Sequence, residues 1–518
     1  MKIRLNESIL TLYLTFITIS SVYLYGTRNK FLLCLIIAGL LVVFYFCSFF
    51  ILKVIRNLEI NRPANDARGL RTRVFLLSFV FAFLIFIACF SAAYPGTFET
   101  DCITQLKQAV TGKYDDWHPI WHTLVYFTFP YKLFGSASSI VVLQILYLSL
   151  AIGYMSATIF KYAGLGWSIG SFAWIVLNPF TLYISVSPLK DVGFATVSLV
   201  AMTIAADVLL EGDHANVTWI KCAVLGFMLA NVTIFRHNGL LFSLFLLFAL
   251  FFGIDFRKWM VAAVAAVLTI AVIEGPVYKL IDAEHVDTAV IQVVGLPMSI
   301  IGNVAKETPD LLDDETREFV FGIAPQEIWN ERYSRGNFNL MKYGGMYNPD
   351  IIEEAGVVKI VSMSIRAAAV SPQAALESFF ALTDFVYGWD VREKADIDVI
   401  TMDSAENDLG ISWSGSPSIR NALNRYHSLI RLKGINFTRK LCFSLLAVIA
   451  AVLATCSLSS LDDWKRLFIS FPILAYDFGT MLLLSGHDAR FFFVSFLICP
   501  LTVVVILAGN GIDKEVAS

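Results

Sequence analysis

The sequence predicts an all-α polytopic membrane protein with about twelve transmembrane helices. Of the 518 residues, 57% are hydrophobic and only 16% are charged, and the mean hydropathy is +0.68. Apolar runs of roughly 17–22 residues, the length that crosses a bilayer as a helix, recur along the chain. Because backbone polar groups need internal partners in hydrocarbon, these runs are expected to be helices.

The expected spans are the uninterrupted apolar windows, taken in order. The first follows a short charged flank without a small-residue cleavage site, so we expect a retained helix. Residues 120–134 are apolar but short, with Pro119 and Pro130 near their ends, and are assigned to the outer interface. The windows lie near Ile9–Tyr25, Phe31–Leu52, Val74–Ala92, Ser138–Phe160, Ser168–Val186, Val192–Leu210, Trp219–Phe235, Gly239–Gly253, Trp259–Pro276, Leu441–Ser457, Leu467–Leu484 and Phe491–Ala508.

Lysine and arginine in short loops predict the orientation. The connection over residues 53–73 carries six of them, so it is expected on the cytoplasmic side of a cell membrane, with both termini inside. Three regions follow: residues 1–276, an N-terminal transmembrane module with a catalytic outer loop at 93–123; residues 277–440, a mixed extracytoplasmic domain or large loop; and residues 441–518, the C-terminal transmembrane helices. The middle region is either a passive lid or a substrate-recognition element.

Composition also excludes two classes of site. The net charge of −3 and a pI near 6.2 leave no basic stripe for nucleic acid, so no nucleic-acid partner is expected. The eight cysteines show no CxxC or CxxxxH spacing, and all but Cys102 fall in or at apolar runs. Neither a disulfide framework nor a zinc site is indicated.

Four polar clusters abut the predicted outer ends of spans. Charge beside hydrocarbon is costly, and a convergence of acids and cations at one outer cavity suits a phosphate-bearing lipid and a hydroxyl acceptor. The clusters are Glu99 with Asp101, Lys190 with Asp191, Arg236 with His237 and Asn238, and His487 with Asp488 and Arg490.

Asp101 lies one helical turn before Gln105, so both side chains can point into one site from a short interfacial helix. A carboxylate at that place can act as a general base. The alternative is that Thr97, Glu99 and Asp101 cap and charge the start of that helix. Both interpretations stay open on the sequence alone.

The cationic residues also have two interpretations. Lys190 and Asp191 either contribute to the site or neutralise each other as an ion pair at the interface. Arg236 and Arg490 either bind phosphate bidentately or snorkel from the ends of their helices.

Asp116, His118 and His122 have a spacing that is compatible with a divalent metal ion, because the two imidazoles lie four residues apart after a carboxylate. The alternative is hydrogen bonding at the interface, with Pro119 opening a helix. No other cofactor is indicated.

A set of short motifs resembles the GT-C superfamily of membrane glycosyltransferases, in particular a bacterial family of multi-span proteins. The motifs cover the membrane part of the chain and not the large loop. They are YPG at Tyr94–Gly96 with Asp101 and Gln105, HP at His118–Pro119 with Thr123, NPF at Asn178–Phe180 with Lys190–Asp191, RxNG at Arg236–Gly239, and HxxR at His487 and Arg490.

The resemblance implies a GT-C-like fold and transfer of a sugar, with inversion, from a polyprenyl-phosphate donor to an envelope glycan or lipid-linked acceptor at the outer membrane face. It implies Asp101 as the base, with Glu99 as an alternative acid and Asp191 as a second site acid. Substrate binding is expected from Tyr94, Gln105, His118, Lys190, Arg236, Asn238, His487 and Arg490.

Two other functional classes remain open. A secondary transporter or lipid flippase also fits about twelve spans, but it should show an internal repeat and charges at mid-span near broken helices. An acyltransferase that uses His118 or His487 would transfer an acyl group and no sugar.

Overall fold

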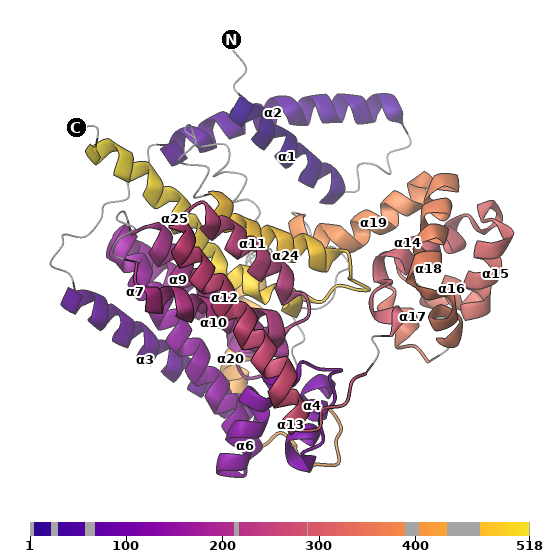
Figure 1. The fold of residues 1–518 in the computed structure, drawn as a ribbon. Coiled ribbons are helices and arrows are strands. Elements are labelled where there is room, and N and C mark those ends of the chain that lie inside the picture. The colour runs from indigo at the N-terminus through magenta and orange to yellow at the C-terminus, as the bar shows by residue number, and fades with distance from the viewer. Residues whose placement is uncertain are drawn as a thin grey trace. The chain divides into compact units, whose positions relative to one another are not determined.

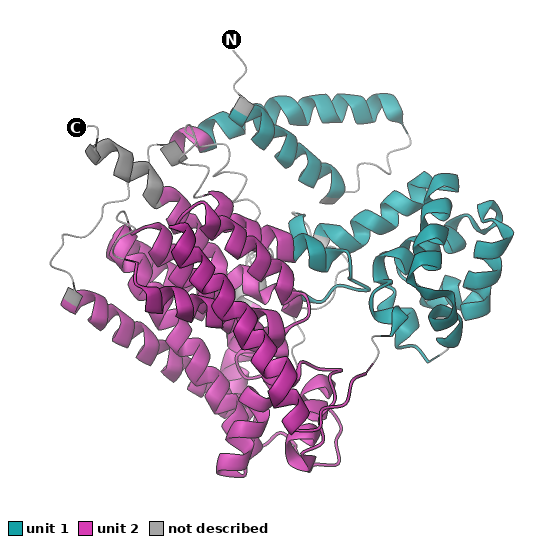
Figure 2. Cartoon of the chain, in the orientation of Figure 1, with its two compact units in different colours: residues 1–51, 287–395, 477–489 teal, residues 52–286, 396–476, 490–518 magenta. Residues whose placement is uncertain are grey.

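A computed structural model describes residues 5–21, 29–56, 68–211, 217–286, 289–345, 347–388, 403–432 and 467–516. Helices are the regular structure of these residues, and they contain no strand, only the isolated bridges Asp115–Glu284 and Ser334–Asn337 (Figure 1). The chain forms two compact units, each assembled from three separated stretches (Figure 2). Unit 1 comprises residues 1–51, 287–395 and 477–489, and unit 2 comprises residues 52–286, 396–476 and 490–518.

Unit 1 contains a helical bundle with its own apolar core. Trp329 and Phe338 are fully buried there and stack with ring centroids 6.3 Å apart. The described residues of 277–440 contain helices and no strand, so the mixed helix-and-strand content expected for this region is wrong for them. The helices of unit 1 are α1 (Leu5–Ser21), η5 (Val290–Gln292), α14 (Gly295–Glu307), η6 (Pro309–Leu311), α15 (Asp314–Ile323), α16 (Gln326–Arg332), α17 (Asn339–Lys342), α18 (Asp350–Val370) and α19 (Pro372–Tyr387).

Unit 2 contains the long apolar helices around α9, which packs against α7, α10 and α25 (Figure 1). Its helices are α3 (Arg68–Ala93), α4 (Thr100–Thr111), α5 (Ile120–His122), η2 (Thr123–Thr128), α6 (Phe129–Phe134), α7 (Ala137–Val176), α8 (Pro179–Ile184), α9 (Lys190–Leu209), α10 (Trp219–Phe235), α11 (Gly239–Phe251), α12 (Phe256–Val272), η4 (Ile273–Val277), α13 (Tyr278–Leu280), α20 (Pro417–Leu432), η7 (Phe468–Ser470) and α25 (Phe493–Val516). Two helices, α2 (Lys30–Arg56) and α24 (Phe471–Met481), carry residues of both units, and the short η8 (Ala489–Phe492) begins at the boundary.

The prediction of an all-α membrane protein is confirmed. Six helices among the described residues are long and apolar enough to cross a bilayer, and α10 and α11 are shorter apolar helices. The predicted window Leu441–Ser457 lies outside the described residues. In the window Leu467–Leu484 the main helix is α24, which has only 11 residues. The six spans are Lys30–Val54, Gly69–Ala93, Ala137–Val176, Lys190–Leu209, Phe256–Leu280 and Ala489–Leu507.

The 40-residue α7 contains a reversal of the chain at Gly164. This residue has φ 83° and ψ 179°, a backbone conformation that glycine adopts without steric cost. Ser168 Oγ then donates to the carbonyl oxygen of Ser156 over 2.8 Å, although twelve residues of straight helix would span about 18 Å. The first leg of α7 and its second leg, residues 165–176, therefore fold back on each other. The sequence windows at Ser138–Phe160 and Ser168–Val186 separate at this same place.

A charged cluster holds four helices together at the C-terminal end of α9. Asp207 accepts from Lys161 Nζ at 2.9 Å and from Lys221 Nζ at 2.5 Å, and Tyr162 Oη donates to it at 2.8 Å. Arg71 of α3 lies 3.9 Å from the same carboxylate. The cluster thus ties α3, α7, α9 and α10 at the end opposite to Lys190.

Candidate functional site

The loop before α4 is fixed in place by the segment before α9. Thr97 N–H donates to the carbonyl oxygen of Val186 at 3.0 Å, and Ser187 Oγ donates to the carbonyl oxygen of Thr97 at 3.0 Å. Gly96 has φ 127°, and a Cβ there would lie 2.4 Å from Cγ2 of Val141. Glycine is therefore required for the chain to pass this point and enter α4 beside Lys190.

The same loop is covered by residues 403–416, which we call the strap. Its backbone N–H groups at Ala405, Ser414 and Ser416 donate to the carbonyl oxygens of Phe98, Tyr94 and Ser91 at 2.7–2.9 Å. Within the strap, Asn407 Nδ2 donates to two carbonyl oxygens and its Oδ1 accepts from two backbone N–H groups. The strap is thus held in one conformation by its own hydrogen bonds, and it in turn fixes the position of the loop before α4.

Trp413 and Arg420 add three further contacts to the strap. Trp413 Nε1 donates to the carbonyl oxygen of Ala92 at 2.8 Å, and the guanidinium of Arg420 lies 4.7 Å from the centroid of the Trp413 ring. Arg420 also pairs with both oxygens of Asp403, at 3.0 and 3.2 Å. The strap and the first turn of α20 are therefore held against the end of α3.

Arg490 is the centre of an ionic cluster at the start of α9. Its Nη1 lies 3.3 Å from Oε2 of Glu99 and 3.4 Å from Oδ2 of Asp101, and its Nε lies 3.9 Å from Oδ2 of Asp191. One guanidinium thus contacts carboxylates from the approach to α4, from α4 itself and from α9. The acids that the sequence placed on separate segments share this cation.

Lys190 and Asp191 turn to different partners and do not neutralise each other. Lys190 Nζ lies 3.9 Å from Oδ2 of Asp101 and donates to Nδ1 of His118 at 3.1 Å. Asp191 pairs with Arg236, whose guanidinium also lies 4.5 Å from the ring centroid of Phe491. The sequence-based alternative of an internal Lys190–Asp191 pair is therefore wrong.

The acidic side chains of the cluster differ in solvent exposure. The side chain of Asp191 is 1% exposed, whereas those of Asp101 and Glu99 are 31% and 40% exposed. Glu99 occupies the N-cap position of α4 but makes no side-chain cap hydrogen bond. Asp101 and Glu99 are consequently the carboxylates that a substrate can reach, and Asp191 is the buried counter-ion of Arg236.

Electrostatics keep Asp101 ionised. Burial raises the pKa of its carboxyl, but the positive charges of Arg490 and Lys190 outweigh burial, and the pKa lies below its ordinary value. The opposite applies to His118. Burial and the neighbouring Lys190 lower the pKa of His118 to about 4, so the imidazole is neutral at pH 7 and accepts the Lys190 hydrogen bond.

Gln105 lies on the same face of α4 as Asp101, one turn further on, but it serves a separate network. Its Nε2 lies 3.1 Å from Nδ1 of His122 and donates to Oγ1 of Thr123 at 2.9 Å. His122 is fully buried, which lowers its pKa to about 3. This network joins α4 to the π-helical turn η2 and supports the helix that carries Asp101.

Three predicted substrate-binding residues have other settings. The carbonyl oxygen of Tyr94 accepts from the strap, and its half-exposed ring packs against Phe90 with centroids 5.6 Å apart. Asn238 precedes α11, and its carbonyl oxygen accepts from Leu241. His487 belongs to unit 1, where its Nε2 donates to the carbonyl oxygen of Ala381 at 2.7 Å. Their roles in binding stay predictions.

The three residues with metal-ligand spacing face different partners. His118 contacts Lys190, His122 contacts Gln105, and Asp116 pairs with His285 Nδ1 at 2.5 Å and accepts from Val286 N–H at 2.6 Å. Within the described ranges, no group of three or more His, Cys, Asp or Glu side chains has the arrangement of a metal site. The spacing of these residues along the chain therefore does not gather them at one point.

Sequence reasoning missed the strap and the ring of Phe491. Ser404, Trp413 and Arg420 lie within the predicted large loop 277–440, and nothing local assigns them to the approach to α4. Phe491, which follows the predicted site residue Arg490, lies under both Arg236 and Arg490. Its position next to Arg490, a candidate phosphate contact, was the signal in the sequence that could have identified Phe491 as a site residue.

Comparisons with known proteins give one match. The model of a family of unknown function (DUF6020) matches residues 5–484. No curated protein and no solved structure matches the chain. The match spans both compact units, so the loop before α4, the strap and most of unit 1 lie within the matched residues, whereas Arg490 follows them.

Proposed function

The chain belongs to this family of unknown function, DUF6020, and we propose that it is a membrane glycosyltransferase. It moves a sugar from a polyprenyl-phosphate donor to an envelope glycan or lipid-linked acceptor at the outer face of the cell membrane. In this proposal the membrane part adopts a GT-C-like arrangement, with about twelve spans and both termini in the cytoplasm.

One observation carries the proposal: Asp101 is partly exposed and lies between two cations. Arg490 Nη1 and Lys190 Nζ lie 3.4 and 3.9 Å from its Oδ2. Both cations are themselves partly exposed, so an anionic group of a substrate can reach them. A carboxylate that can take a proton, next to cations that can hold a leaving phosphate, is the arrangement that single-displacement glycosyl transfer needs.

The reaction is a direct displacement. The acceptor hydroxyl oxygen attacks the anomeric carbon, its proton passes to the Asp101 carboxylate, and the bond from that carbon to the phosphate oxygen breaks. The phosphate leaves with the electron pair and is held by Lys190 and Arg490. Attack from the face opposite to the leaving group inverts the anomeric configuration.

Asp191 and Arg236 act on the substrate indirectly, through Arg490. Both side chains are nearly buried, and their pairing offsets the charge that each would otherwise carry into the interior. Asp191 also lies 3.9 Å from Nε of Arg490, so the pair orients the guanidinium that faces Asp101. We therefore assign positioning roles to Asp191 and Arg236.

The places of the charges favour an enzyme over a transporter. Lys190 and Asp191 open α9, Arg236 ends α10, and Arg490 lies in the short turn before α25. A transporter site would place such groups near the middle of broken helices. The burial of His118 and its hydrogen bond to Lys190 likewise argue against an acyltransferase that uses this histidine.

Replacement of the base tests the proposal. Purified protein in proteoliposomes receives a polyprenyl-phosphate donor with a labelled sugar and an envelope-lipid extract as the acceptor source. Asp101→Asn is expected to lower sugar transfer by at least about a thousandfold while the protein keeps its thermal unfolding midpoint. Glu99→Gln is the matched control because Glu99 contacts the same guanidinium, and it should retain most of the transfer. Wild-type transfer in Asp101→Asn would remove Asp101 from the mechanism.

A further inference from the structure

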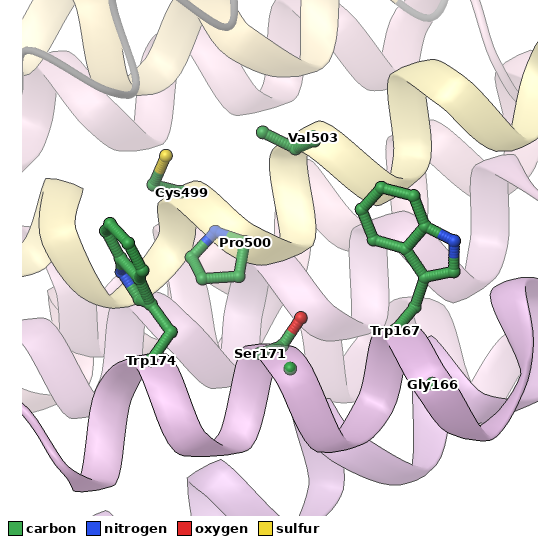
Figure 3. A pocket seen from close by; sticks show the side chains of 8 residues that line it. Gly166, Trp167, Ser171, Trp174, Cys499, Pro500 and Val503 are labelled. Atoms are coloured by element: carbon green, nitrogen blue, oxygen red, sulfur yellow. The ribbon is translucent and has the colours of Figure 1, made fainter. Parts of the chain in front are cut away.

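An apolar groove of about 490 Å³ lies between the second leg of α7 and the middle of α25. Trp167 and Trp174 stand at its two ends, with Ser171 on α7 between them and Pro500 on α25 opposite (Figure 3). α25 carries most of the candidate span Ala489–Leu507, and the second leg of α7 is the part of Ala137–Val176 that follows the reversal at Gly164. Apolar walls of this kind suit a hydrocarbon chain.

The sequence explains why the two helices leave a groove here. Gly166 and Gly170 lie one turn apart on the face of α7 that lines it, and a Cβ at either position would meet nothing within 4 Å. On α25, Pro500 has no backbone N–H and cannot donate to the carbonyl four residues earlier. The missing side chains on α7 leave the space between the two helices unfilled, and the ring of Pro500 forms part of the opposite wall.

The groove and Arg490 lie along the same stretch of chain, η8 followed by α25. The α25 residues of the groove begin at Cys499 and end at Val503, which places them roughly 14–20 Å along the helix from Arg490. Buried aromatic rings pack together in the interval. Phe493 packs on Phe180 with centroids 5.6 Å apart, and Phe496 stacks on Trp174, at the near end of the groove, with centroids 5.9 Å apart.

We infer that this groove binds the prenyl chain of the lipid phosphate whose headgroup lies at Lys190 and Arg490. The inference rests on the proposed function for the identity of the headgroup. The groove is lined by apolar surface and offers no charged side chain, so a hydrocarbon chain fits it and a sugar does not. Its distance from Arg490 requires a chain that extends well beyond the first prenyl units.

Groove-filling variants test the inference through binding, without a transfer assay. The protein in nanodiscs is titrated with a long-chain polyprenyl monophosphate and with geranyl monophosphate, which is too short to reach Cys499. The wild type is expected to bind the long chain about tenfold or more tightly than geranyl monophosphate, because the long chain buries additional apolar surface in the groove.

Gly170→Leu should remove this preference by weakening the long chain about tenfold and leaving geranyl monophosphate unchanged. Gly166→Leu fills the same groove and is a second variant if the first fails to fold. Gly39→Leu, in α2, is the matched control, since its Cβ also meets nothing within 4 Å, and it should bind both probes as the wild type does.

An unchanged preference for the long chain in both filling variants overturns the inference. So does equal competition by phosphatidylglycerol, which would make the groove a site for bulk lipid. A selective loss of long-chain binding in a protein that transfers no sugar supports the groove while the proposed function fails. If the wild type transfers sugar from a polyprenyl-phosphate donor but Gly170→Leu affects the binding of both chain lengths equally, the proposed function is supported and the groove inference is overturned.

Discussion

Arg490 Nη1 lies 3.4 Å from Oδ2 of Asp101, and this contact joins the first turn of α4 to η8, the short turn before the last helix. The same nitrogen lies 3.3 Å from Oε2 of Glu99. Because a guanidinium remains charged at every pH at which the protein is folded, it holds Asp101 in the ionised state that a general base needs. In the proposed mechanism Arg490 is therefore both a phosphate contact and the residue that sets the protonation of the base.

Arg490→Gln is expected to change the pH dependence of transfer as well as its rate. Arg490 is the largest of the positive influences that lower the Asp101 pKa, so removing it raises that pKa. Activity requires the ionised base and is lost as pH falls through the Asp101 pKa, so the acid limb of the kcat/KM profile should move to higher pH. Loss of the phosphate contact should also lower kcat/KM by about 100–1,000-fold.

A control separates charge from shape in this experiment. Arg490→Lys keeps the positive charge but loses the fork that reaches two carboxylates, so it should retain the wild-type acid limb with a reduced rate. An acid limb that does not move in Arg490→Gln would show that Arg490 does not govern the base.

His118 should act by orienting Lys190. His118→Leu removes the acceptor of the 3.1 Å hydrogen bond, whereas His118→Asn keeps an oxygen near the place of Nδ1. A hydrogen bond to a charged group contributes about 1.5–3 kcal/mol, so the leucine variant should lose about 10–100-fold in kcat/KM for the donor. The asparagine variant should recover most of that loss. Equal activity of the two variants would assign His118 to packing alone.

The buried histidines should make the protein sensitive to acid. The folded-state pKa of His122 is about 3, below its ordinary value of 6.5, because burial disfavours the charged ring. A depressed histidine pKa means that stability is fully present above pH 6.5 and declines as pH falls toward 3, by about 1.4 kcal/mol for each pH unit. His122→Gln should lose less of its thermal midpoint than the wild type between pH 7 and about 5. Parallel curves for both proteins would contradict the assignment.

The all-α membrane character could be predicted from the sequence for a simple physical reason. Apolar length and isolated charge are local properties, so the window at Val192–Leu210 and the charged pair before it were recognisable directly. The reversal of the chain at Gly164 was harder to predict from the sequence, because it depends on the backbone conformation of that one residue. A glycine inside an apolar run predicts no particular angle.

Long-range partners could not be predicted in this way. Nothing near Ser404 or Trp413 indicates that they form hydrogen bonds to residues some 300 positions earlier. Most of these strap contacts are made through the backbone, one hydroxyl and one indole N–H, which leave no pattern in the sequence. The pairing of Lys190 with His118, rather than with its own neighbour Asp191, is likewise a consequence of packing. Adjacent residues of a helix point in different directions, which the linear spacing of charges does not report.

The strap should be needed for activity through the order it gives the loop before α4. Trp413→Ala removes the hydrogen bond to Ala92 and the ring beneath Arg420, which together contribute about 1–3 kcal/mol. Hydrogen exchange over residues 91–98 should then become faster, and kcat should fall while the global unfolding midpoint changes little. Trp413→Phe keeps the ring and should show a smaller change. Unaltered exchange in Trp413→Ala would separate the strap from the site.

The charged cluster at the far end of α9 should contribute to stability and not to catalysis. Asp207 is the shared acceptor of Lys161 and Lys221, and its side chain is only 8% exposed. Asp207→Ala leaves both ammonium groups with Glu211 as their remaining carboxylate in the cluster, at 2.9 and 3.9 Å. Loss of one partner of a buried pair costs about 3–5 kcal/mol, so the thermal midpoint should fall by several degrees.

Glu211→Gln is the matched control for Asp207→Ala, because Glu211 contacts the same two lysines but is more exposed, at 27%. It should lower the midpoint by less than half as much. Both variants should bind geranyl monophosphate as the wild type does at low temperature, since the cluster lies at the opposite end of α9 from Lys190. Weakened binding in Asp207→Ala under conditions where it remains folded would instead show that the two ends of α9 are energetically coupled.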